Sequence, residues 1–178
     1  YGPTTHTQRM DMAKRIARAL DRGCLGVSYG IRYVPGIDSE ELIATAQPCK
    51  KDGKMIAAHV RSDAEEIYDA ARELMDTGKA LGLPTQISHI GSMAGFGQMR
   101  SFLEMVDEAR ANGLDVACDC YPYYAFSTTI GSTTYDPGWL ERYHCDYDAI
   151  ELCEGKYKGT RCTKETFEEM RRDMPECM

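Results

Sequence analysis

The stretch that decides the fold is MIAAHVRSD, at residues 55–63. Its first five residues form a short apolar run, and the polar residues after it lead into a long amphipathic helix predicted over residues 63–81. The same order of apolar run, polar loop and helix occurs around three other runs, which begin at residues 24, 85 and 115. Because consecutive runs start 30 or 31 residues apart, the sequence predicts four repeated β/α units.

The four apolar runs have the composition of strands that are buried on both faces of a parallel sheet. They cover residues 24–28, 55–59, 85–89 and 115–120. Right-handed connections would order them either into an open doubly wound sheet or into an arc of a (β/α)8 barrel. No G-x-G-x-x-G follows the first run, so a dinucleotide site has no support. A full barrel needs about 250 residues, so this chain could supply only about half of one.

The pattern changes after Pro122. A long polar and aromatic loop follows, with only short helical segments after it and no strand signal. We therefore divide the chain into a β/α segment, residues 1–128, and an insertion-like tail of loops and short helices, residues 129–178. The predicted helices cover residues 8–22, 39–49, 63–81, 98–112, 138–143, 147–152 and 163–173.

Composition excludes several functional classes. The 21 basic and 28 acidic residues give a net charge of -7, which argues against nucleic-acid binding and against a basic membrane-surface helix. No 18 consecutive apolar residues occur, so no transmembrane helix is predicted. The strong helix and strand periodicity is unlike that of a disulfide scaffold, and it favours a cytoplasmic protein with reduced thiols in the first half of the chain. The four cysteines of the tail remain open to a disulfide or an incidental metal site.

Two histidines end neighbouring predicted strands, His59 and His89. The carboxyl ends of parallel strands carry the active site in α/β proteins. Adjacent strands lie about 4.8 Å apart, so two imidazoles in register could share one metal ion with bonds of about 2.1 Å. Such a metal would acidify water and polarise a carbonyl, as in a hydrolase. The alternative is that each histidine is a hydrogen-bonded structural residue.

Four motifs follow one another in an order that resembles a known family. They are GVSYGIRYVPG at residues 26–36, AHVR at 58–61, ISH at 87–89, and DCYPY at 119–123, the last followed by Ser127-Thr128. This order and spacing resemble the D-aminoacylase branch of the amidohydrolase superfamily, the N-acyl-D-amino-acid deacylases. The resemblance covers the chain from about residue 8 to residue 128.

The resemblance implies a metal-dependent (β/α)8 barrel, of which this chain would supply part, and deacylation of a small N-acyl-D-amino acid. His59 and His89 align with the family's zinc-binding histidines, with one or two metal ions in the intact protein. Tyr121 would donate a hydrogen bond to the scissile carbonyl oxygen, an oxyanion role. Arg61 would bind the substrate carboxylate with its guanidinium fork, and Ser127 would help to hold it.

Plainer roles remain for some of these residues. Arg61 could pair with Asp63 or Glu65, and Tyr121 could be a packed loop aromatic. Two further cysteines, Cys118 and Cys120, share a strand face, where packing is the favoured role rather than nucleophilic catalysis.

The sequence departs from the family pattern in ways that limit the prediction. The family often has lysine two residues after the second histidine, where this chain has Gly91. An H-x-H motif, a ligating cysteine and a late aspartate that acts as general acid and base are not found in the 178 residues. We therefore expect a central fragment of a deacylase that is inactive in isolation. The alternatives are a hydantoinase-like cyclic amide hydrolase and a non-catalytic binding or assembly module.

Exposed sheet edges are a further expectation. A half-barrel would leave the strands at residues 24–28 and 115–120 without a neighbour on one side. Two copies could pair through these edges as a homodimer. Alternatively, the tail could fold back over the sheet as a lid.

Overall fold

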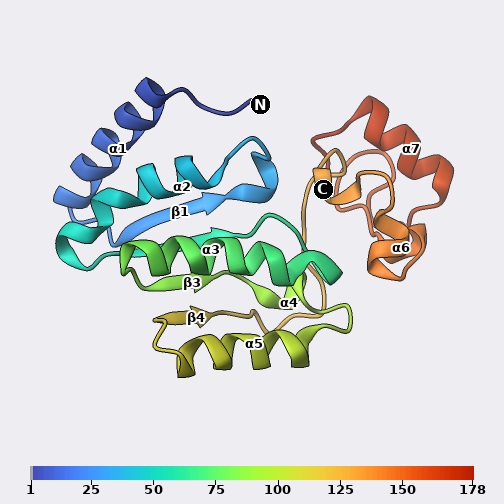
Figure 1. Cartoon of the computed structure of the whole chain (residues 1–178). Helices are drawn as coiled ribbons and strands as arrows, with labels where there is room; N and C mark the ends of the chain where they lie inside the picture. The colour runs from blue at the N-terminus through green and yellow to red at the C-terminus, as the bar shows by residue number, and fades with distance from the viewer. Residues whose placement is uncertain (1) are drawn as a thin grey trace. The chain divides into compact units, whose positions relative to one another are not determined.

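The structure, a computed structural model, describes residues 2–178 except the side chain of residue 52 (Figure 1). The chain separates into two compact units, Tyr1–Pro122 and Tyr123–Met178. The division predicted from the sequence, at residue 128, falls a few residues inside the second unit.

The first unit is built on a four-stranded parallel sheet, which confirms the predicted α/β class. Its strands are β1 (Gly26–Gly30), β2 (Met55–His59), β3 (Thr85–Ile87) and β4 (Val116–Cys118). They lie in the order β1-β2-β3-β4, so each strand pairs with the next strand along the chain. This sequential parallel order is the one that consecutive right-handed β/α units produce in a barrel.

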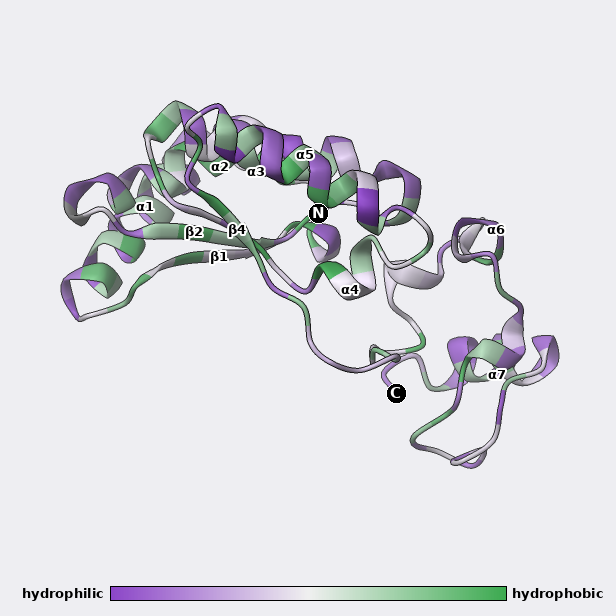
Figure 2. Ribbon diagram, turned by 90° about the horizontal axis from the view of Figure 1, so that it is seen from below, coloured by the Kyte–Doolittle hydropathy of each residue, from purple (hydrophilic) through white to green (hydrophobic). Residues whose placement is uncertain are grey.

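Four longer helices accompany these strands: α1 (His6–Asp21), α2 (Ser39–Ala46), α3 (Ile67–Leu81) and α5 (Met99–Ala111). Helices α2, α3 and α5 lie together on one side of the sheet (Figure 2). Short helical segments complete the connections: η1 (Ile31–Tyr33), η2 (Gln47–Asp52), η3 (Ala64–Glu66) and α4 (Ile90–Met93).

Local chemistry explains where the element boundaries differ from those predicted. The helix expected over residues 39–49 ends at Ala46 and continues as the 3-10 segment η2, in which Pro48 has no N–H to donate. The strand expected to reach His89 ends at Ile87, because His89 has a left-handed backbone with φ 41° and ψ 52°. Helix α3 ends as predicted at Gly82, whose φ of 65° suits a residue without Cβ.

The hydrophobic core lies between the sheet and its helices. The strand side chains that face the helices are buried or partly buried, and they meet the apolar stripes of α2, α3 and α5. Each large side chain buried in this way contributes about 1.5–3 kcal/mol of transfer free energy. Fully buried members of the core include Leu42, Ile56, Leu74, Ile87 and Phe102.

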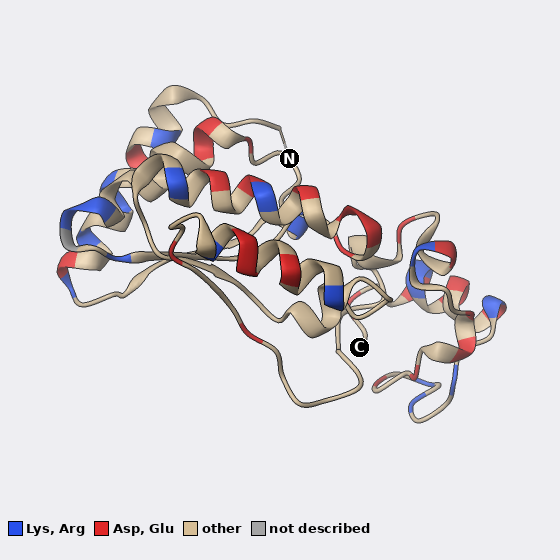
Figure 3. Ribbon diagram, turned by 60° about the horizontal axis from the view of Figure 1, so that its bottom comes forward, with Lys and Arg blue, Asp and Glu red and all other residues tan. Residues whose placement is uncertain are grey.

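The opposite face of the sheet carries small and polar side chains. Ser28, Ala57, Gln86 and Ala117 lie side by side across its four strands, and all four are at least partly exposed. The strands contain no Lys, Arg, Asp or Glu, and the charged residues lie on the helices and connections (Figure 3).

β1 and β4 are the outer strands of this sheet, and their pairing with a second copy stays a prediction. In the part of the chain that the structure describes, every helix is too short or too polar to span a bilayer. The cytoplasmic location stays a prediction.

The second unit is organised around aromatic rings rather than a sheet. Its helices are α6 (Trp139–Tyr143) and α7 (Lys164–Asp173), with the 3-10 turns η4 (Thr133–Tyr135) and η5 (Tyr147–Ala149). The indole of Trp139 contacts the rings of Tyr135, Tyr147 and Phe167 at centroid distances of 5.2 to 5.6 Å. Thr163 and Thr166 form a capping box at the start of α7.

All eight cysteines of the chain are free thiols. This agrees with the reduced state expected for the cysteines of the first half. It also leaves the four cysteines of the tail without a disulfide.

Candidate metal and substrate site

The structure brings His59 and His89 side by side at the carboxyl end of the sheet. His59 is the last residue of β2, and His89 follows β3 by two residues. Their ring centroids are 4.6 Å apart and their planes make an angle of 69°. Two imidazoles that bind one zinc ion through bonds of about 2.1 Å have centroids roughly 5 Å apart. The two rings are therefore close enough to share a metal ion.

His89 is held in its left-handed conformation by Asp119, the residue that follows β4. Its backbone N–H donates to Oδ1 of Asp119 at 2.6 Å, and Oδ2 of the same carboxylate accepts a hydrogen bond from Gln86 at 2.7 Å. The Oγ of Ser92 lies 3.1 Å from Nδ1 of His89. A hydrogen bond at Nδ1 leaves Nε2 as the nitrogen that can bind a metal. The positive φ of His89 marks a constrained residue of the kind that clusters at functional sites.

His59 lies between two rings. The ring of Tyr33 is 4.8 Å from it on one side and His89 is on the other. Burial lowers the pKa of His59 from 6.5 to about 4, and the positive charges of His89 and Arg32 act in the same direction. The imidazole is therefore neutral at pH 7, which is the form that binds a metal ion.

The described side chains would supply only part of a metal site. Among residues 2–178, no group of three or more His, Cys, Asp or Glu side chains converges on a common point. Two imidazoles suit zinc, but a zinc ion takes four ligands. His59 and His89 thus fit as two of them, and the remaining positions would belong to water, substrate or other residues of the intact protein.

Arg61 lies two residues beyond His59, with its guanidinium bound by protein acceptors. Its Nε and Nη2 donate to the two carboxylate oxygens of Glu73 at 2.9 and 2.8 Å. Nη1 donates to the carbonyl of Pro35 at 3.0 Å, and Nη2 donates to that of Ile37 at 2.6 Å. The hydrogen bond to Glu73 is the main cause of a raised pKa for Arg61. Substrate binding by Arg61 stays a prediction, and these contacts indicate a second role, argued below.

The other two predicted residues lie in different parts of the chain. Tyr121 is half-buried and follows β4 by three residues, so it belongs to the sheet end that carries the histidines. Ser127 belongs to the second unit, where it is exposed and its Oγ lies 3.7 Å from Sδ of Met178. The catalytic role of Tyr121 and the binding role of Ser127 stay predictions.

The structure gives a steric reason for the glycine that replaces the family's lysine. A Cβ on Gly91 would lie 2.7 Å from Sγ of Cys120, which is closer than real Cβ contacts. The thiol therefore takes the space in which a side chain at position 91 would begin. Gly91 therefore fits beside the thiol of Cys120, where a larger residue would not.

Three residues near the histidines were missed by sequence reasoning: Tyr33, Ser92 and Asp119. A signal existed for Asp119, because the alternation of strand residues places it on the same face as Ala117, which is the face that carries His59 in β2. Ser92 gave no such signal, since its contact with His89 depends on the left-handed turn.

Comparison with solved structures defines the class of protein. A D-aminoacylase whose crystal structure defines a novel subset of amidohydrolases matches 99% of this chain, with a TM-score of 0.75 and 22% identity. A D-aminoacylase variant in complex with copper chloride matches 72% of the chain, with a TM-score of 0.68 and 32% identity. The four parallel β/α units are therefore part of an amidohydrolase (β/α)8 barrel.

Within this class, the curated relatives of the chain are deacylases of N-acyl-D-amino acids, which confirms the resemblance seen in the motifs. The N-acyl-D-glutamate deacylase of Alcaligenes xylosoxydans xylosoxydans is 34% identical over 132 residues. The N-acyl-D-aspartate deacylase of the same organism is 32% identical over 131 residues. These matches cover 72% and 71% of this chain but only 27% and 26% of those enzymes, so the chain spans about a quarter of their length. No protein-family model matches the chain.

Proposed function

We propose that the protein is a metal-dependent hydrolase that removes the acyl group from N-acyl-D-amino acids, with His59 and His89 as two of its zinc ligands. The observation that carries this proposal is the pair of imidazoles 4.6 Å apart at the ends of adjacent parallel strands. It is supported by relatives with this activity over the same segment. Structures of relatives contain a binuclear metal centre in D-aminoacylase, and zinc in an N-acyl-D-glutamate deacylase of Bordetella bronchiseptica.

Different side chains of the protein would have separate roles in amide hydrolysis. When bound, zinc would acidify water and polarise the substrate carbonyl. The neutral imidazole of His59 and the Nε2 of His89 would hold the ion, and Asp119 with Ser92 would keep the second ring in place. Tyr121 would donate a hydrogen bond to the carbonyl oxygen of the amide. Addition of water across the C–N bond yields a carboxylate and a free D-amino acid.

A panel of substrates tests this proposal. The zinc-loaded protein, expressed from its complete gene, is given N-acetyl-D-glutamate, N-acetyl-D-leucine, their L-enantiomers and a hydantoin. We expect release of the D-amino acids, at rates at least roughly a hundredfold above those of the L-enantiomers, because a site built around fixed polar contacts discriminates strongly. Chiral chromatography of the products measures both rates.

Two outcomes of the panel would contradict the proposal. Faster opening of the hydantoin would identify a cyclic amide hydrolase. Failure to cleave any of the compounds with zinc bound would favour a binding or assembly module.

A further inference from the structure

The loop that follows β1 is fastened to the segment that follows β2. This β1 loop, residues 31–38, runs from η1 to the start of α2. Two of its own backbone hydrogen bonds give it shape, from the N–H of Val34 to the carbonyl of Ile31 and from the N–H of Ile37 to that of Val34. Two turns of this kind do not by themselves fix a loop in one place, so its position depends on contacts with its neighbours.

Arg61 makes the central hydrogen bonds that hold the β1 loop. Its guanidinium donates to the carbonyl oxygens of Pro35 and Ile37 in the β1 loop and, on the other side, to both carboxylate oxygens of Glu73 in α3. The side chains of Arg61 and Glu73 are 30% and 20% exposed. These four hydrogen bonds use four of the five N–H groups of an arginine side chain. The fork therefore connects the β1 loop to a helix that is anchored in the core.

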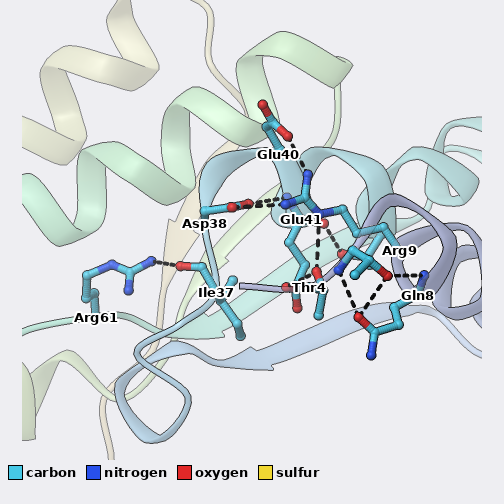
Figure 4. Close-up of polar contacts among 10 residues, drawn as sticks. Thr4, Gln8, Arg9, Ile37, Asp38, Glu40, Glu41 and Arg61 are labelled. Carbon is cyan, nitrogen blue, oxygen red and sulfur yellow. Dashed lines mark hydrogen bonds and ion pairs between the residues drawn. The ribbon is translucent and has the colours of Figure 1, made fainter. Parts of the chain in front are cut away.

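Charged contacts reach the same loop on either side of Arg61. In Figure 4, Arg9 of α1 approaches Asp38 at one end of the loop, while Arg61 reaches the carbonyl of Ile37. The Asp38 carboxylate also caps α2 by accepting from the N–H of Glu41 at 2.8 Å. At the other end, Arg32 lies 3.7 Å from the buried carboxylate of Asp63. Arg61 and Asp63 both belong to the short segment after His59, so that segment contacts the loop twice.

The β1 loop contributes Tyr33, which lies beside His59 in the candidate site. Tyr33 packs its ring 4.8 Å from that of His59. It also lies over Gly30, where a Cβ would be 3.3 Å from the tyrosine ring. Any shift of the loop would therefore move Tyr33 relative to His59.

We propose that Arg61 is a positioning residue, which together with Glu73 holds the β1 loop so that Tyr33 rests against His59. This role differs from the binding of a substrate carboxylate, because its bonding partners are two backbone carbonyls and a glutamate of the chain itself. Its consequence for catalysis rests on the proposed function, whereas the fastening of the loop does not.

Hydrogen exchange of the whole protein tests the fastening without any assay of activity. We expect exchange at the amides of Val34 and Ile37 to rise roughly tenfold or more in Arg61→Ala and in Glu73→Ala, since a loop that loses its anchor opens locally. The double variant should exchange no faster than either single variant, because both remove the same connection. Arg72→Ala, on the neighbouring exposed residue of α3, is the matched control and should exchange as the wild type does.

A spectroscopic readout separates positioning from a general loss of stability. The imidazole proton resonances of His59 in the metal-free protein should shift in Arg61→Ala and Glu73→Ala in the same direction as in Tyr33→Leu, while the amides of β2 and β3 keep their protection. Arg61→Lys keeps the charge but not the fork and should behave as Arg61→Ala does. Arg61→Lys therefore replaces Arg61→Ala in these measurements if the alanine variant does not fold.

Glu73→Gln distinguishes the positioning role from substrate binding alone. The proposal predicts faster exchange at Val34 and Ile37 in this variant, because Arg61 loses the carboxylate that anchors it. If Arg61 serves only to bind a substrate carboxylate, loss of the Glu73 charge will leave the exchange of Val34 and Ile37 and the resonances of His59 unchanged. That outcome would overturn the proposal, even if deacylation is demonstrated. Faster exchange in a protein that does not deacylate would support the fastening and refute only the proposed function.

Discussion

Replacing either His59 or His89 by alanine is expected to weaken zinc binding by at least about a hundredfold, because each variant loses one of two imidazoles that converge on the ion. Loss even of residues that merely orient a ligand costs about 10- to 100-fold in metal affinity. Since one imidazole alone holds zinc poorly, the double variant should bind little more weakly than either single variant. Isothermal titration calorimetry at pH 7, where His59 is neutral, measures the three dissociation constants.

His6→Ala is the matched control for these variants. His6 is the first residue of α1 and is exposed, so its removal should leave the zinc affinity as in the wild type. An unchanged affinity in both His59→Ala and His89→Ala would show that zinc is bound elsewhere and that the two rings are structural.

Gly78→Ala is expected to destabilise the protein by about 1–3 kcal/mol, the range found for overpacked cores. Helix propensity alone predicts the opposite sign, because alanine is favoured over glycine by about 1 kcal/mol inside a helix. The packing decides, since a Cβ on Gly78 would lie 1.9 Å from Oγ1 of Thr85 and 3.2 Å from the carbonyl of Leu83. Thr85 belongs to β3 and is only 2% exposed, so it has little room to move away. Chemical denaturation monitored by circular dichroism measures the change.

Thr85→Ala provides the internal check on this explanation. It removes the hydroxyl that the new methyl group would meet, so Gly78→Ala should cost less in the Thr85→Ala background than in the wild type. A Gly78→Ala protein as stable as the wild type would show that α3 and β3 can move apart at no cost.

The periodic features of the fold could be predicted from the sequence because each depends on local composition. The run at residues 55–59 is observed as β2 with the same bounds, and Gly82 ends α3. The pairing of the histidines could also be anticipated, since parallel strands of similar length bring equivalent ends together. Predicting this pairing required only the positions of the two apolar runs and the parallel order of their strands.

Contacts made across the fold could not be predicted in the same way. The sequence offered Asp63 or Glu65, both close by, as alternative partners of Arg61 if it did not bind substrate. The structure instead pairs Arg61 with Glu73, in the second turn of α3, and with carbonyls before α2. The left-handed backbone of His89 depends on Asp119, thirty residues away. Such long-range contacts leave no periodic signal in the sequence.

Anomalous diffraction from crystals of the zinc-loaded protein, recorded on both sides of the zinc absorption edge, tests the central claim most directly. The account predicts a zinc peak at about 2.1 Å from one ring nitrogen of His59 and from Nε2 of His89. A zinc-loaded crystal whose peaks all lie away from these two imidazoles would contradict it.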